Sequence, residues 1–312
     1  MLRKRWAVVA LAAVALGAAA PPAGPAAAAM SRDRAVSSDA VSSGHRATSI
    51  TVDPAGSTGT TAPTVGTQAI FGPDDRVPVD ETTTYPASAT VLLTFPGGRC
   101  TGFMISERTV ATAGHCVHTG GSNGQWRTNI VAYPGHNGTT APFGGCMATR
   151  LFAPQGWTGS VYAPGGGDPA YDYGAVQLNC AIGNRTGWYG LGYPAGQVTG
   201  SCTTTHGYPV DRPGQWASTA VVRAEDANFI YVQNDFTTGQ DGSPVFYTPD
   251  PDRCPPPRII IPCPCPPLPC PCEIVTVFGI LTGGPFGTGP GLTNNVVTRI
   301  TPQAINNLMQ WR

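Results

Sequence analysis

Short runs of β-branched and aromatic residues, separated by glycine and proline, recur along most of the chain. Apolar residues at helical spacing are scarce there, so the runs predict strands rather than helices. Strands at this spacing, with turn-forming residues between them, are typical of β-barrels. We therefore expect an all-β fold with strands at 89–95, 101–105, 129–133, 173–178, 219–223, 229–232, 245–247, 274–281 and 295–300.

The composition favours a loop-rich β protein. Glycine and proline account for 40 and 32 of the 312 residues, and charged residues for only 12%, which is about half the usual share. One helix is expected at the C-terminal end. Thr301 can cap it and Pro302 suits its first turn, while Ile305, Leu308 and Met309 share one face.

Residues 1–29 have the layout of a secretory signal peptide. Arg3, Lys4 and Arg5 precede an apolar run that ends at Pro21-Pro22, and small residues with Ala-x-Ala cleavage sites follow. The run is shorter than the about 20 apolar residues of a membrane-spanning helix. We therefore predict a secreted, extracellular protein that does not reside in a membrane.

Residues 30–69 are dominated by serine, threonine, alanine, glycine and aspartate, without apolar periodicity. They predict a propeptide or disordered leader, with a stalk-like linker as the alternative. Removing the three basic residues of the signal peptide leaves 15 basic residues against 18 acidic ones, a net charge near −3. No basic patch indicates a nucleic-acid partner or an anionic membrane.

Ten cysteines in an exported chain indicate disulfides. Residues 248–272 form a Pro/Cys-rich insert that we expect to be an exposed, extended loop, because so many prolines exclude a helix or a sheet interior. Its Cys-x-Cys elements could bind a soft metal, but an oxidising compartment favours disulfides. We predict no metal site and no cofactor. Six cysteines stay unassigned: Cys202, Cys254, Cys263, Cys265, Cys270 and Cys272.

His115 is the first candidate catalytic residue. It lies in the sequence Thr-Ala-Gly-His-Cys, and Cys100 stands 16 residues before Cys116. A Cys100–Cys116 disulfide would staple two adjacent strands and fix the loop that carries the imidazole. A catalytic histidine must be held within hydrogen-bond reach of its partners, so such a staple would serve that purpose.

Asp172 is the second candidate, because it leads directly into the apolar run 173–178. A buried carboxylate there could hold the histidine tautomer and stabilise the imidazolium. Asp168 competes for this role four residues earlier. Cys146 and Cys180 fall before and after this strand and could pair.

With Gly239-Gln-Asp-Gly-Ser-Pro244, these motifs occur in the order of a chymotrypsin-type triad. The chain resembles the trypsin-like serine peptidases, and most of all the V8-like, glutamyl-endopeptidase branch. The resemblance covers roughly 70–312. Further stretches that carry it are Asp74-Asp-Arg76, Cys100-Thr-Gly102, Gly207-Tyr-Pro209 and Thr298-Arg-Ile-Thr301.

The resemblance implies a serine peptidase domain over 70–312, with two six-stranded antiparallel β-barrels and the active-site cleft between them. It implies that the backbone N–H groups of Gly239 and Asp241 form the oxyanion hole. Asp241 stands where the family has its nucleophilic serine. Ser243 lies two residues further on, so its side chain should not meet His115 unless the loop is rebuilt.

A carboxylate beside the imidazole favours a charged histidine and so removes the general base. We therefore expect little or no proteolysis by the usual mechanism. The expected function is that of a secreted serine endopeptidase-type protein, weakly active or inactive. The alternative is a dead homologue that binds peptides or proteins. The partner is a polypeptide substrate or a protein ligand, and the protein is expected to be a monomer.

The resemblance also places Asp235, Phe236 and Leu281 at the primary substrate pocket. Asp235 invites a preference for arginine or lysine, but V8-like relatives often carry it without that specificity. The glutamyl branch usually has a histidine where this chain has Leu281, and Phe236 stands where a small hydroxyl residue would help. A preference for glutamate is therefore not supported.

Overall fold

The computed structural model describes residues 35–39, 69–161, 166–248, 259–260, 274–285 and 288–312. The predicted signal peptide (1–29), most of the predicted leader and most of the 248–272 insert lie outside these residues. Among the described residues, no helix is both long and apolar enough to cross a membrane.

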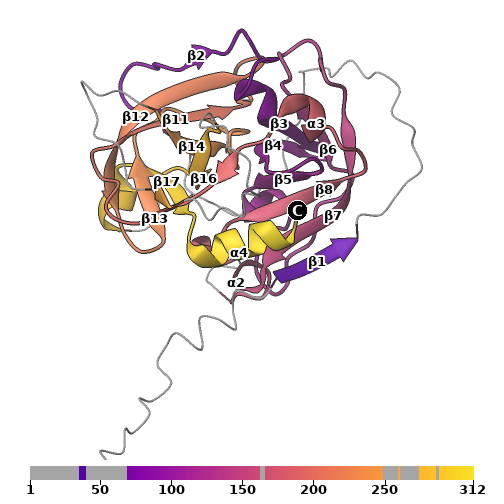
Figure 1. Ribbon diagram of the computed structural model, residues 1–312. Coiled ribbons are helices and arrows are strands. Elements are labelled where there is room, and N and C mark those ends of the chain that lie inside the picture. Colours follow the sequence, from indigo (N-terminus) through magenta and orange to yellow (C-terminus); the bar gives the residue numbers. More distant parts are fainter. Residues whose placement is uncertain (1–34, 40–68, 162–165, 249–258, 261–273, 286–287) are drawn as a thin grey trace, which may run out of the picture.

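Six antiparallel strands form the first barrel, in the order β7-β6-β3-β4-β5-β8, and pairing between β7 and β8 closes it (Figure 1). β1 (Ala35–Asp39), from the predicted leader, pairs with β7 from outside this ring. The six strands are β3 (Thr90–Phe95), β4 (Gly98–Met104), β5 (Thr109–Thr112), β6 (Val131–Pro134), β7 (Cys146–Pro154) and β8 (Gly174–Leu178).

The second barrel has the order β11-β14-β16-β17-β13-β12 and is closed by pairing between β11 and β12. Its strands are β11 (Cys202–Gly207), β12 (Trp216–Glu225), β13 (Phe229–Val232), β14 (Pro244–Tyr247), β16 (Thr276–Gly283) and β17 (Asn295–Arg299). Four short strands lie at its margin: β2 (Val77–Pro78) on β12, β9 (Gly190–Leu191) on β16, and β10 (Tyr193–Pro194) with β15 (Ile259–Ile260).

The predicted all-β fold with two six-stranded antiparallel barrels is thus confirmed. Each of the nine predicted strands coincides with an observed one, within a few residues at its ends. Three barrel strands were missed, namely β5, β7 and β11. In β11 the run Thr203–Thr205 is buried on both faces, and hydroxyl hydrogen bonds such as Thr203 Oγ1 to the Ala220 carbonyl replace apolar contacts. A polar strand of this kind has no hydrophobic pattern to reveal it.

The expected C-terminal helix is α4 (Pro302–Gln310), and its cap is Thr301, whose side chain accepts a hydrogen bond from the Ala304 amide at 3.2 Å. The other α-helices of the described residues are single turns, α2 (Gln155–Thr158) and α3 (Gly183–Thr186). α4 follows β17 of the second barrel and ends against the first barrel (Figure 1). There Trp311 stacks on Phe152. The helix therefore links the two barrels.

We expect Leu308→Ala to lower the free energy of unfolding by about 2–5 kcal/mol, because it opens a cavity under α4. Leu308 is fully buried in the apolar core. Gln303→Ala on the exposed face of the same helix is the matched control and should change stability little. Urea unfolding of both variants measures the difference, and equal losses would contradict the docking of α4.

Candidate active site

His115 lies in a short turn (Gly114–Cys116) that follows β5 of the first barrel. A disulfide joins Cys116 to Cys100 in β4, so the turn is tied covalently to a neighbouring strand. Little space separates Gly114 from Asp172 and Tyr173. A Cβ at Gly114 would lie 3.0 Å from Asp172 Oδ1 and 3.1 Å from the backbone nitrogen of Tyr173. Glycine therefore lets the turn close down on Asp172.

Asp172 holds His115 at two points. Its Oδ2 lies 2.8 Å from the ring Nδ1, and its Oδ1 accepts a hydrogen bond from the His115 backbone N–H at 2.8 Å. The carboxylate is almost fully buried. Asp168, the competing candidate, instead caps the short turn Pro169–Tyr171 by accepting from the Ala170 amide. Of the two candidates, Asp172 is therefore the carboxylate that contacts His115.

Asp241 comes from the second barrel and faces the other side of the ring. Its Oδ1 lies 3.7 Å from His115 Nε2. Gly242 lets this loop lie directly on the first barrel. A Cβ there would be only 2.1 Å from the Thr101 carbonyl and from Thr112 Oγ1. Its φ is +87°, in the region that favours glycine. The Thr101 amide also donates to the Asp241 carbonyl at 2.8 Å. Glycine is required for this close approach.

Gly239, the other expected oxyanion-hole residue, has a φ of +96°, a conformation that glycine adopts readily. Ser243 is fully buried, and its hydroxyl donates to the Gln240 carbonyl at 2.6 Å. The serine hydroxyl is therefore engaged within its own loop.

The three residues expected at the substrate pocket are all buried. Phe236 and Leu281 are fully buried in the core of the second barrel. Asp235 is buried too, and its two oxygens accept hydrogen bonds from the backbone amides of Phe71 at 2.7 Å and Asp75 at 3.0 Å. Its carboxylate is thus occupied by the N-terminal segment of the domain.

The charges around His115 act against each other. Burial lowers the pKa of the imidazole, as does the nearby charge of Arg127. The charge and hydrogen bond of Asp172, with the charge of Asp241, outweigh both and raise the pKa of His115 to about 9. The ring is therefore an imidazolium at neutral pH.

Within the described part of the chain, one group of potential metal ligands lies close together: Cys100, His115 and Cys116. The disulfide uses both sulfur atoms, so only the imidazole is left to bind an ion. A second disulfide joins Cys146 to Cys180, the pair considered from the sequence. Cys202 is also disulfide-bonded.

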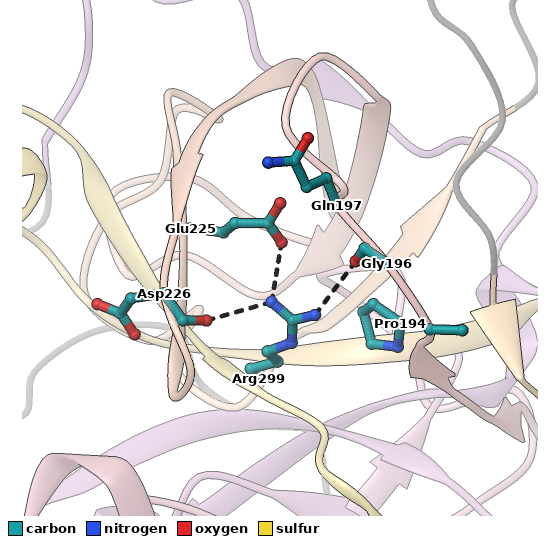
Figure 2. Close-up of a pocket in the computed structure, with 7 residues that line it drawn as sticks. Pro194, Gly196, Gln197, Glu225, Asp226 and Arg299 are labelled. Atoms are coloured by element: carbon teal, nitrogen blue, oxygen red, sulfur yellow. Dashed lines mark hydrogen bonds and ion pairs between the residues drawn. The ribbon is translucent and has the colours of Figure 1, made fainter.

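A hollow of about 420 Å³ lies on the second barrel, away from these residues (Figure 2). Two of its charged side chains, those of Arg299 and Glu225, bind each other. Arg299 Nη1 lies 2.8 Å from Glu225 Oε2, and its Nη2 donates to the Gly196 carbonyl at 3.3 Å. None of its lining residues belongs to the His115 site, so we do not assign the function to this hollow.

Comparison with known proteins decides the family. Residues 77–225 match the family description Trypsin. The chain is 34% identical over 248 residues to a glutamyl endopeptidase of Bacillus licheniformis, which covers 78% of this chain and 69% of that protein. It belongs to the trypsin-like serine peptidases. The resemblance to the glutamyl-endopeptidase branch is likewise confirmed.

Two further proteins are similar to the chain. An extracellular metalloprotease of Bacillus subtilis is 30% identical over 257 residues, or 80% of this chain and 71% of that protein. A solved structure of a Glu endopeptidase in complex with MPD has a TM-score of 0.61 at 23% identity, over 78% of this chain and 98% of that chain. At this identity the structure supports the fold alone.

One set of contacts at the site was not predicted from the sequence. Asp74-Asp-Arg76 was noted as part of the family resemblance, but its contacts with the loop before Asp241 were not. The only available signal was an arginine that follows two acidic residues, which does not reveal a partner more than 100 residues away in the chain.

The raised pKa of His115 predicts a pH-dependent stability. A folded-state pKa of about 9, above the ordinary value of about 6.5, adds stability that is fully present below pH ~6.5 and is lost as the pH rises to about 9. Asp241→Asn removes one of the two carboxylates that raise the pKa, so its loss of stability in this window should be smaller. Urea midpoints of parent and variant across this pH range measure the difference, and parallel pH profiles would contradict the electrostatic account.

Proposed function

We propose that this chain is an exported trypsin-like peptidase homologue that binds polypeptides and hydrolyses them weakly or not at all. One observation carries the proposal. The carboxylate of Asp241 faces His115 Nε2 at 3.7 Å, where the family places the hydroxyl of its nucleophilic serine.

Serine-type hydrolysis needs a hydroxyl whose proton a neutral imidazole can take. An ionised carboxylate has no proton to give, and the charges of Asp172 and Asp241 keep His115 protonated because they raise its pKa to about 9. The same carboxylate places an anion near N–H groups that would otherwise stabilise the tetrahedral intermediate. The chain therefore lacks both a nucleophilic hydroxyl at position 241 and a neutral His115 that could act as the general base.

Polypeptide binding is supported by the family, whose members act on polypeptides, and by the undisturbed framework of the site. The disulfide-tied turn, the two contacts of Asp172 with His115 and the seating of Gly242 are all present. A residual peptidase activity is the second candidate. Loss of triad residues leaves roughly 10³–10⁴-fold catalysis over water in enzymes where it has been measured.

The Bacillus licheniformis relative is named a glutamyl endopeptidase, but we do not extend a preference for glutamate to this chain. Leu281 stands where the glutamyl branch usually has a histidine, and it is buried. Export is supported by the layout of residues 1–29 and by the extracellular relative of Bacillus subtilis. We propose that the protein acts outside the cell as a monomer, without a cofactor.

Asp241→Ser should restore the missing nucleophile. We expect this variant to react with a fluorophosphonate probe and to hydrolyse an unstructured polypeptide at least about 10³-fold faster than the parent chain, since a complete triad acts as a unit. Probe labelling followed by peptide mapping, together with a hydrolysis time course, measures both effects.

Asp241→Ser combined with Ser243→Ala is the matched control and should still be labelled, at the serine introduced by the first substitution. Labelling of the parent chain at Ser243 would show that the loop has been assigned wrongly. A folded Asp241→Ser chain without labelling would exclude Asp241 as the nucleophile position.

A further inference from the structure

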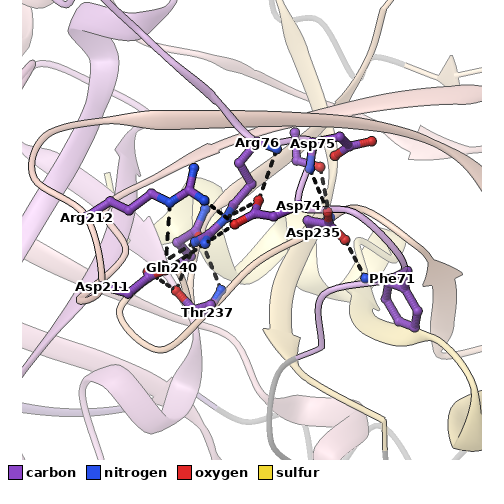
Figure 3. Close-up of polar contacts among 10 residues, drawn as sticks. Phe71, Asp74, Asp75, Arg76, Asp211, Arg212, Asp235, Thr237 and Gln240 are labelled. Carbon is purple, nitrogen blue, oxygen red and sulfur yellow. Dashed lines mark hydrogen bonds and ion pairs between the residues drawn. The ribbon is translucent and has the colours of Figure 1, made fainter.

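Arg76 is a buried charge with all three of its guanidinium nitrogens bonded (Figure 3). Only 1% of its side chain is exposed. Nε and Nη2 donate to the two oxygens of Asp74 at 3.0 and 2.8 Å, and Nη1 and Nη2 donate to those of Asp211 at 3.1 and 2.6 Å. Such paired, two-pronged contacts fix the orientation of the guanidinium.

The same guanidinium also contacts the loop that leads to Asp241. Nη1 donates to Thr237 Oγ1 at 3.0 Å and to Gln240 Oε1 at 3.3 Å. These two residues close a turn around Gly239. The Gln240 amide donates to the Thr237 carbonyl, and the Thr237 amide donates back to Gln240 Oε1 at 3.0 Å. Arg76 thus binds both ends of the turn that directly precedes Asp241.

The orientation of the Gln240 side-chain amide matches the two donors that surround its oxygen. Its Oε1 accepts from Arg76 and from the Thr237 amide, while its buried Nε2 finds no partner among the described residues. An unpaired buried donor is costly. If the side-chain amide of Gln240 were flipped, Nε2 would point at two other donors, those of Arg76 and of the Thr237 amide. These two donors therefore select the observed orientation of the amide.

Arg76 belongs to a segment that is fixed to the second barrel along its length. Ala69 exchanges two hydrogen bonds with the Asn295 side chain, and the amides of Phe71 and Asp75 donate to Asp235. Beyond Arg76, β2 (Val77–Pro78) pairs with β12. The guanidinium therefore has a fixed base from which to hold the turn. Figure 3 shows the contacts of Asp235 with Phe71 and Asp75 beside those of Arg76.

We propose that Arg76 is a positioning residue that acts through Gln240 to set the backbone N–H groups of Gly239 and Asp241. The proposal rests on the proposed function, since those N–H groups matter to a bound polypeptide carbonyl only if the site binds polypeptides. Removing the guanidinium takes one of two donors from Gln240 Oε1, which keeps the Thr237 amide, and takes the two-pronged contact from Asp211, which keeps the Thr237 hydroxyl. The turn then loses its defined position, although the barrels remain.

Amide hydrogen exchange in the full chain tests this without any need for hydrolysis. We expect Arg76→Met and Gln240→Met each to speed the exchange of the Gly239 and Asp241 amides about 10-fold or more, because a local restraint is lost. Gln240→Met leaves Arg76 paired with Asp74 and Asp211, so it tests the link to the turn in a chain that keeps the ion pairs. Arg299→Met is the matched control. It breaks another partly buried pair in the same barrel, with Glu225, and should leave these two amides unchanged.

Kinetics in the Asp241→Ser chain give the second readout. Arg76→Met should lower kcat by about 10- to 100-fold with little change in KM, because misplaced oxyanion donors act on the transition state. Arg76→Lys should recover part of the loss. Arg76→Met should lower kcat less in a chain that already carries Gln240→Met than in one that keeps Gln240, because the contact between the two side chains is already gone.

Unchanged exchange at both amides in Gln240→Met, or an equal loss of kcat in Arg299→Met, would overturn the proposal. The experiments distinguish a failure of the proposed function from a failure of the positioning role of Arg76. If Asp241→Ser hydrolyses nothing while Arg76→Met and Gln240→Met still speed the exchange, the peptidase assignment fails and the positioning role stands. If Asp241→Ser hydrolyses polypeptides with the same kcat in the presence of Arg76→Met, the positioning role fails alone.

Discussion

The two contacts between Asp172 and His115 are the interaction on which the site depends. One carboxylate holds both the ring Nδ1 and the backbone N–H of the same residue, so the imidazole can neither turn nor move away from β8. Nε2 is thereby aimed at the loop of the second barrel. Because Gly242 lets that loop lie directly on Thr101 and Thr112, the residue at position 241 must face Nε2. The fold therefore fixes where the reacting group stands, whichever side chain occupies the position.

Aspartate at position 241 leaves the framework of the site in place but changes the charge around His115. The imidazole lies between two carboxylates, and their charges outweigh its burial, so that the pKa of His115 rises to about 9. In a serine peptidase the corresponding ring must be neutral before it can accept a proton. Under the proposed function, aspartate at this position removes the nucleophile, and its charge adds to that of Asp172 in raising the pKa of His115. The Arg76 network beside the loop has no part in that change, since its contacts are with Thr237 and Gln240.

Much of the fold and the order of the site residues could be predicted from the sequence, for physical reasons. Runs such as 229–232 are rich in β-branched and aromatic residues, and they become strands. His115 and Asp172 were found because each lies beside a recognisable strand or cysteine. β11 was missed because most of its buried residues are threonines, and two of them bond to β12 through their hydroxyls, Thr203 to the Ala220 carbonyl and Thr204 to Thr219. The partners of Asp235 were missed because they are backbone amides 160 residues or more away, which leave no mark on the local sequence.

The protonation state of His115 tests the central claim most directly. Nitrogen-15 NMR of the folded parent chain at neutral pH distinguishes an imidazole with two N–H groups from a neutral ring with one. The account predicts that both Nδ1 and Nε2 carry protons, as expected for a ring whose pKa is about 9 and which lies between two carboxylates. A neutral ring with an unprotonated Nε2 would contradict it, because His115 would then still be available as a general base.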